Sequence, residues 1–60
     1  MSKLKEKRKE VGLSQVQLSL KTGLTKGYIS DLETGRRVNP SLETMKKIAE
    51  ALKCNISDIF

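Results

Sequence analysis

The sequence predicts an all-α fold, a compact bundle of five short helices, and three observations lead to that prediction. Most of the candidate helical segments in the sequence begin after a Ser, Thr or Asn, which are residues that start helices. Several of these segments end at a Gly, which commonly stops a helix. One stretch, residues 41–53, repeats its apolar side chains with a period of 3.6 residues. No stretch alternates apolar and polar residues as a half-buried strand does. We expect the 60 residues to form a single domain, 1–60.

The first two helices are marked by their ends. The first is expected over residues 2–11, behind a possible serine cap and in front of Gly12, a natural stop. The second begins after Ser14 and runs to about Thr22. Gln17 stands three residues after Ser14, which is the spacing of a capping box.

The third helix follows after a very short turn. Gly23 ends the second helix, and Thr25 can cap the third, which has Ile29 and Leu32 on one face and stops at Gly35. Two helices joined by a turn of about three residues form a helix-turn-helix, here at about residues 14–35. In that arrangement the second helix can project into the major groove of DNA.

The fourth helix is the most regular. Either Asn39 or Ser41 can cap it, with Pro40 tolerated in its first turn because a missing N–H costs nothing there. Its apolar stripe consists of Leu42, Met45, Ile48, Ala49 and Leu52. Asn55 and Asp58 indicate one last helical turn, which we expect to carry the apolar side chains near the end of the sequence back onto the core.

Charge and composition narrow the function classes. Lys and Arg number 12 against 7 Asp and Glu, so the net charge is +5 and a polyanionic partner is favoured. A peptide lying on a membrane is not expected, because the helices direct their apolar stripes into a core. The sequence has no His, one cysteine (Cys54) and no apolar run longer than two residues. We therefore expect a cytoplasmic protein that is not an enzyme, with no cofactor or metal, and with Cys54 as a half-buried apolar filler.

The sequence resembles the Cro and phage-repressor type of helix-turn-helix family, often called XRE-like, over nearly the whole chain. The matching features are Arg8, Gly12, Leu13-Ser14-Gln15, Leu18, Gly23, Ile29-Ser30, Glu33, Gly35, Asn39-Pro40-Ser41-Leu42, Ile48-Ala49 and Leu52. The resemblance implies a lambda-repressor-like domain that binds double-stranded DNA sequence-specifically. The function it implies is transcriptional regulation, by repression at a palindromic operator.

The resemblance also implies which residues read bases. It places the helix after Thr25 in the major groove, with base contacts from Thr25, Lys26, Gly27, Tyr28 and Asp31. Lys26 can donate to guanine, and Asp31 can accept from cytosine. Alternatively, Lys26 is a solvated charge and Tyr28 covers the edge of the core. Gly27 departs from the family, which often has a base-reading side chain at this position, and a glycine there would let the backbone approach the DNA closely.

Four further residues are implied as phosphate contacts: Gln15, Ser30, Arg36 and Arg37. Gln15 matches the family position that clamps the DNA backbone, and the two arginines follow the reading helix in a loop that faces it. Ser30 would contact DNA at the margin of that helix. The alternative for all four is an ordinary solvated polar surface.

Other positions are expected to be structural. The resemblance implies an ion pair between Arg8 and Glu33, and a close helix approach at Ser19, where a hydroxyl is tolerable if it bonds back to its own helix. Val16 and Leu20 form an apolar pair on the second helix. We expect neighbouring chain to cover that pair in part.

A homodimer on two half-sites follows from the habits of the family. Its apolar contact surface is expected to consist of Leu52, Ile56, Ile59 and Phe60. The alternative function is an antitoxin-like or other protein-interaction module of the same fold, which would use the face of Val16 and Leu20 to bind a partner protein.

Overall fold

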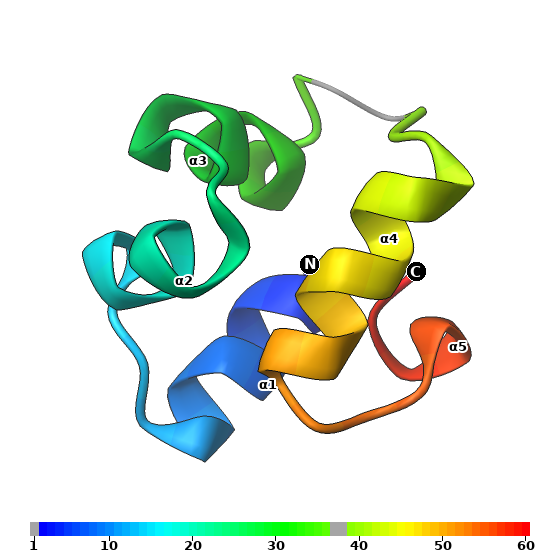
Figure 1. The fold of residues 1–60 in the computed structure, drawn as a ribbon, viewed down its shortest axis with the longest axis horizontal. Helices are drawn as coiled ribbons and strands as arrows, with labels where there is room; N and C mark the ends of the chain where they lie inside the picture. Colours follow the sequence, from blue (N-terminus) through cyan, green and yellow to red (C-terminus); the bar gives the residue numbers. More distant parts are fainter. Residues whose placement is uncertain (1, 37–38) are drawn as a thin grey trace.

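The computed structural model describes residues 2–36 and 39–60, and helices account for all the regular structure in that part of the chain. The all-α prediction is confirmed, and the order of the elements follows the sequence (Figure 1). The helices are α1 (Lys3–Val11), α2 (Gln15–Thr22), α3 (Lys26–Thr34), α4 (Leu42–Ala51) and α5 (Ile56–Ile59).

Four of the helices begin at a hydroxyl side chain that accepts a hydrogen bond from the backbone N–H three residues on. The distances are 3.0–3.1 Å, and each bond satisfies one of the N–H groups that a helix start leaves free. The capping residues are Ser2, Ser14, Thr25 and Ser41. Ser41 rather than Asn39 therefore caps α4, and Pro40 precedes the cap instead of lying in the first turn.

The turn between α2 and α3 is fixed by glycine and by side-chain hydrogen bonds. Gly23 has a φ of +76°, a left-handed conformation that glycine adopts without strain, and its N–H donates to the Ser19 carbonyl at 2.9 Å. The Ser19 hydroxyl donates to the carbonyl of Leu24, beyond the end of α2, and so finds its partner outside its own helix. Thr22 Oγ1 accepts from the N–H of Leu24 at 3.3 Å. These bonds set the angle at which α3 leaves α2.

The core lies where the five helices meet. Helix α1 packs against α3 and α5, and α2 packs against α3 and α4 (Figure 1). The buried apolar residues are Leu4, Leu18, Ile29, Ile48, Ala49, Leu52 and Ile59. The predicted stripe of α4 is correct in its second half, whereas Leu42 is exposed because the first turn of α4 lies at the edge of the bundle (Figure 1). Cys54 is half-buried against the core, as expected.

The dimer surface expected from the sequence is wrong in two of its four residues. Leu52 is 1% exposed and Ile59 is 4% exposed, because α5 folds back and both side chains close the core. Ile56 is half-buried and Phe60 is exposed, so only these two remain accessible. A contact between copies through all four side chains is therefore not available.

The pair on α2 also differs from expectation. Val16 is 50% exposed and Leu20 is 80% exposed, so neighbouring chain covers neither to the extent we expected. Leu18, between them in sequence, points into the core and is fully buried. The opposite side of α2 is therefore left with an accessible apolar pair.

None of the described helices has the length and apolar character needed to cross a membrane. Within the same residues, no group of three or more potential metal-binding side chains comes together.

Candidate nucleic-acid interface

Helix α3 presents one face to the core and the opposite face to solvent. Ile29 and Glu33 are buried, and they lie one turn apart on the inward side. At 100° per residue, a stripe spaced 3, 4 and 7 residues apart falls on the outward side. This outward stripe consists of Gly27, Ser30, Asp31 and Thr34. Three of its residues were predicted from the sequence, and Thr34 was missed although its spacing from Gly27 could have indicated it.

The N-terminal turn of α3 is accessible. The Thr25 hydroxyl accepts from the backbone N–H of Tyr28 at 3.1 Å, so this predicted base reader also caps the helix. Lys26 and Gly27 are exposed, and their backbone N–H groups lie in the first turn, where a helix offers no intrahelical acceptor. Tyr28 and Asp31 are half-buried. The start of α3 thus combines a cation, a glycine and the positive end of a helix dipole on accessible surface.

Gly27 is not required by the fold. Its φ lies outside the left-handed region, and a Cβ placed on it would meet no described atom within 4 Å apart from its chain neighbours and the backbone of its own helix. A glycine inside a helix lowers stability by about 1 kcal/mol relative to alanine. The position therefore carries a cost that nothing in the packing of the protein explains.

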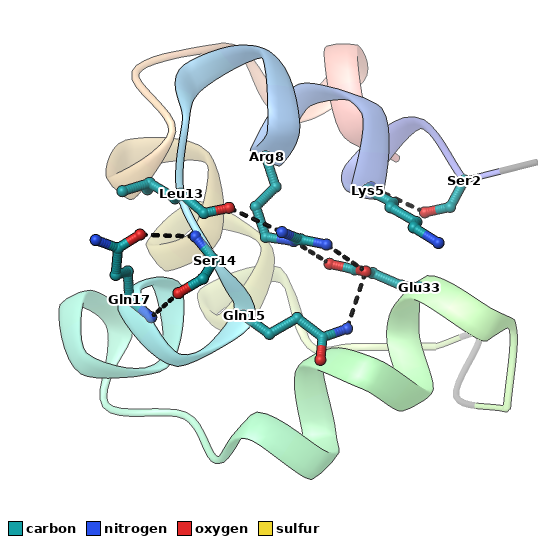
Figure 2. A network of polar contacts seen from close by, with 8 residues as sticks. All are labelled: Ser2, Lys5, Arg8, Leu13, Ser14, Gln15, Gln17 and Glu33. Carbon is teal, nitrogen blue, oxygen red and sulfur yellow. Dashed lines mark hydrogen bonds and ion pairs between the residues drawn. The ribbon is translucent and has the colours of Figure 1, made fainter.

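A buried ion pair joins α1 to the end of α3, as the resemblance implied (Figure 2). Arg8 Nε donates to Glu33 Oε2 at 2.7 Å, and Arg8 Nη2 donates to Glu33 Oε1 at 3.1 Å. The side chains are only 8% and 2% exposed, respectively. The third nitrogen of the guanidinium, Nη1, donates to the carbonyl of Leu13 at 2.8 Å. Arg8 therefore holds α1, the loop before α2 and α3 together.

The electrostatics of Glu33 follow from this environment. Burial is the largest influence and raises the pKa of the carboxyl, but the hydrogen bonds from Arg8 and Gln15 and the charges of Arg8 and Lys5 lower it more in sum. The net result is a Glu33 pKa below the usual value for glutamate. The hydrogen bond to Glu33 likewise raises the pKa of Arg8. Both groups are ionised at neutral pH.

Gln15, at the start of α2, is joined to the same carboxylate. Its Nε2 donates to Glu33 Oε1 at 3.1 Å, across a separation of 18 residues (Figure 2). The neighbouring Gln17 behaves differently, because its Oε1 accepts from the Ser14 N–H at 2.8 Å and completes a capping box. The sequence predicted an outward role for Gln15 but not its contact with Glu33, since no local spacing connects the two residues.

The predicted phosphate contacts are only partly described by the structure. Gln15 and Ser30 are half-buried, and Arg36 is exposed directly after α3. Arg37 lies outside the described residues. The structure thus places Gln15, Ser30 and Arg36 on or beside the two motif helices.

A family model described as helix-turn-helix matches residues 4–59, which is almost the whole chain. The chain belongs to the XRE-like helix-turn-helix family. This family membership confirms the resemblance that the sequence indicated.

Curated relatives of this helix-turn-helix chain include regulators that are longer than it. The immunity repressor protein of Bacillus phage phi105 is 44% identical over 57 residues, which are 95% of this chain and 39% of the repressor. Three of the curated relatives are matched over only 35%, 39% and 49% of their own length. The chain therefore corresponds to one part of each of those proteins.

Solved helix-turn-helix structures have the same fold. SinR, a master regulator for biofilm formation crystallised in complex with DNA, superposes with a TM-score of 0.88 at 32% identity, over 93% of this chain and 92% of that one. The restriction-modification controller protein C.AhdI from Aeromonas hydrophila also gives 0.88, at 38% identity, over 97% of this chain and 86% of that one.

Proposed function

We propose that this chain is a sequence-specific transcriptional regulator that binds double-stranded DNA, with α3 in the major groove, and that it represses by occupying a palindromic operator. The observation that supports this most is the accessible face of α3, carried on a fold that matches the DNA-bound SinR structure at a TM-score of 0.88. The proposal includes a cytoplasmic location and no enzymatic activity, since the relatives are named as regulators or repressors.

Base reading is assigned to the first turns of α3. Lys26 donates to guanine O6 or N7, and Asp31 accepts from cytosine N4 while disfavouring a nearby phosphate. Thr25 and Tyr28 flank these two, and Gly27 brings the helix backbone close to a base edge. The exposure of Lys26 and Gly27 supports these roles.

Phosphate binding is assigned to groups around the two motif helices. Gln15 and the free N–H groups at the start of α2 bind one phosphate, because a helix start favours an anion. Arg36 and Arg37 bind backbone phosphates beyond the end of α3, and Ser30 contacts the DNA at its margin. The net charge of +5 supports long-range attraction of DNA.

A homodimer on two half-sites spaced by about one helical turn is part of this proposal. Its contact surface must use the residues that remain accessible near the end of the sequence, Ile56 and Phe60.

The test is selection from a pool of randomised duplexes with the purified chain, followed by sequencing, at two salt concentrations. Recovery of a palindromic motif is the expected result. Retention that disappears at the higher salt without any enriched motif would contradict sequence-specific regulation, because it would leave only electrostatic binding.

A second candidate is a protein-interaction module, and one observation favours it. Val16 and Leu20 are one turn apart on α2 and are 50% and 80% exposed, so they form an adjacent pair of accessible apolar side chains. This candidate would gain support if the selection recovered no motif and the pair could be changed to Ser without loss of folding.

A further inference from the structure

We infer that Glu33 is a positioning residue for DNA binding, and that it acts by holding the carboxamide of Gln15 in the orientation that binds a phosphate. The inference rests on the proposed function and deepens it. It concerns a buried residue that would not itself touch DNA.

The carboxamide of Gln15 is oriented by its hydrogen bond to Glu33. A glutamine NH2 group has two N–H donors in one plane with its carbonyl. One of these donors is directed to Glu33 Oε1 at 3.1 Å, which holds the amide nitrogen in place and leaves the second donor available to a phosphate. Figure 2 shows the carbonyl oxygen of Gln15 turned away from the carboxylate. A free glutamine side chain would have to lose its rotamer freedom on binding, whereas this one has already lost it.

The carboxylate of Glu33, which orients Gln15, is itself held in place. Glu33 is 2% exposed and receives two hydrogen bonds from Arg8, so its Oε1 has a fixed position relative to α1 and α3. Gln15 therefore takes its orientation from the packed interior rather than from solvent. Gln17, which is on the same helix, accepts from the N–H of Ser14 through its Oε1, and among the described residues it makes no hydrogen bond to Glu33.

The negative charge of Glu33 is compensated by positive charges within the protein. A carboxylate this close to a phosphate-binding amide would repel the phosphate if it were unpaired. Arg8 pairs with Glu33 directly, and the charge of Lys5 also acts on it. The pair as a whole is neutral, so Glu33 can orient Gln15 without opposing the approach of DNA.

The experiment is a double-mutant cycle on duplex binding. It compares Gln15→Ala in the unmodified protein with Gln15→Ala in a variant carrying Arg8→Met and Glu33→Met, which removes the ion pair without leaving a buried charge unpaired. The probe is a labelled duplex of about 20 base pairs carrying the motif recovered by selection. Gln17→Ala is the matched control, since it removes a glutamine that does not contact Glu33.

We expect Gln15→Ala to weaken binding about five- to tenfold in the unmodified protein, as loss of one hydrogen bond does, and less than about twofold when the ion pair is absent. Gln17→Ala should change binding by the same factor in both backgrounds. Equal effects of Gln15→Ala in the two backgrounds would overturn the inference, and so would no effect in the unmodified protein. Failure of the unmodified protein to bind any duplex would overturn the proposed function and this inference together.

A second measurement covers the case in which the Met variant fails to fold. In the unmodified protein, titration with the same duplex should shift the NMR signals of the Gln15 side-chain amide more than those of Gln17. Slow solvent exchange of one Gln15 amide proton before DNA is added is also expected. Unshifted Gln15 signals at saturation would overturn the inference.

Discussion

At the scale of single residues, the most informative position on α3 is Gly27. The folded chain leaves open space where its side chain would be, and its backbone needs no glycine. The residue costs helix stability, and the interior of the protein gains nothing from it. Under the proposed function, the gain is a close approach of the helix backbone to DNA.

Gly27→Ala should therefore separate stability from binding. We expect the variant to be more stable by up to about 1 kcal/mol, because alanine is the better helix former and no clash arises within the protein. Its affinity for the recovered operator should fall, because a methyl group would enter the contact. Thermal unfolding and duplex titration measure the two effects. A more stable variant with unchanged affinity would show that DNA does not approach this position closely.

The Arg8–Glu33 pair is the second residue-scale feature with a measurable consequence. Removing one partner by Glu33→Ala should destabilise the domain by about 3–5 kcal/mol, because a buried guanidinium loses its counter-charge. A domain of this size has a free energy of unfolding of only a few kcal/mol, so much of the variant should be unfolded. Arg8→Met with Glu33→Met should be close to neutral. Urea unfolding measures both, and equal losses in the two variants would argue against a stranded charge.

At the scale of elements, the structure agrees best with the sequence-based predictions at the ends of helices, which are determined by neighbouring residues. The caps at Ser14 and Thr25 and the stop at Gly23 were predicted, because a helix end is specified by residues within one turn of it. Of the contacts between elements, the Arg8–Glu33 pair was implied by the resemblance, but two others were not predicted. The Gln15 bond to Glu33 and the Ser19 bond to Leu24 depend on how α2 meets α3, and no local pattern encodes that.

Which apolar residues of α4 and α5 would be exposed was likewise not fully predictable from local sequence. The sequence indicated a last helical turn that returns apolar side chains to the core, but it did not indicate that Leu52 and Ile59 would be fully enclosed and lost to a contact surface. In the folded chain they complete the core. An apolar residue near the end of a sequence thus belongs to the interior or the surface according to the path of the chain.

Because of the Arg8–Glu33 pair, which joins α1 to α3, we expect the free energy of unfolding to depend on pH. The pKa of Glu33 is lowered by folding, so the unfolded chain binds more protons and the stabilising contribution is complete above the ordinary glutamate value of about 4.3. It is lost as the pH falls through the lower, folded value. Urea unfolding should therefore show a larger acid-induced loss of stability for the unmodified protein than for the Met variant. Equal losses would contradict the assigned role of Glu33.

At the scale of the whole molecule, the account predicts how salt affects binding. Each phosphate that a Lys or Arg neutralises should contribute about −0.9 to the slope of log affinity against log salt. Arg36→Ala should make this slope shallower by about 1 unit and weaken binding to all sequences alike. Titrations at several salt concentrations measure the slope. An unchanged slope would exclude Arg36 as a phosphate contact.

Under the proposed function, α3 reads DNA bases. Repeating the duplex selection with Lys26→Ala is the most direct test of this role. The account predicts a motif that has lost its preference at one position of each half-site, with affinity for the original operator reduced by about 1–3 kcal/mol. Arg36→Ala, the matched control, should recover the original motif with weaker binding. Recovery of the unaltered motif by Lys26→Ala would contradict base reading by Lys26 on α3.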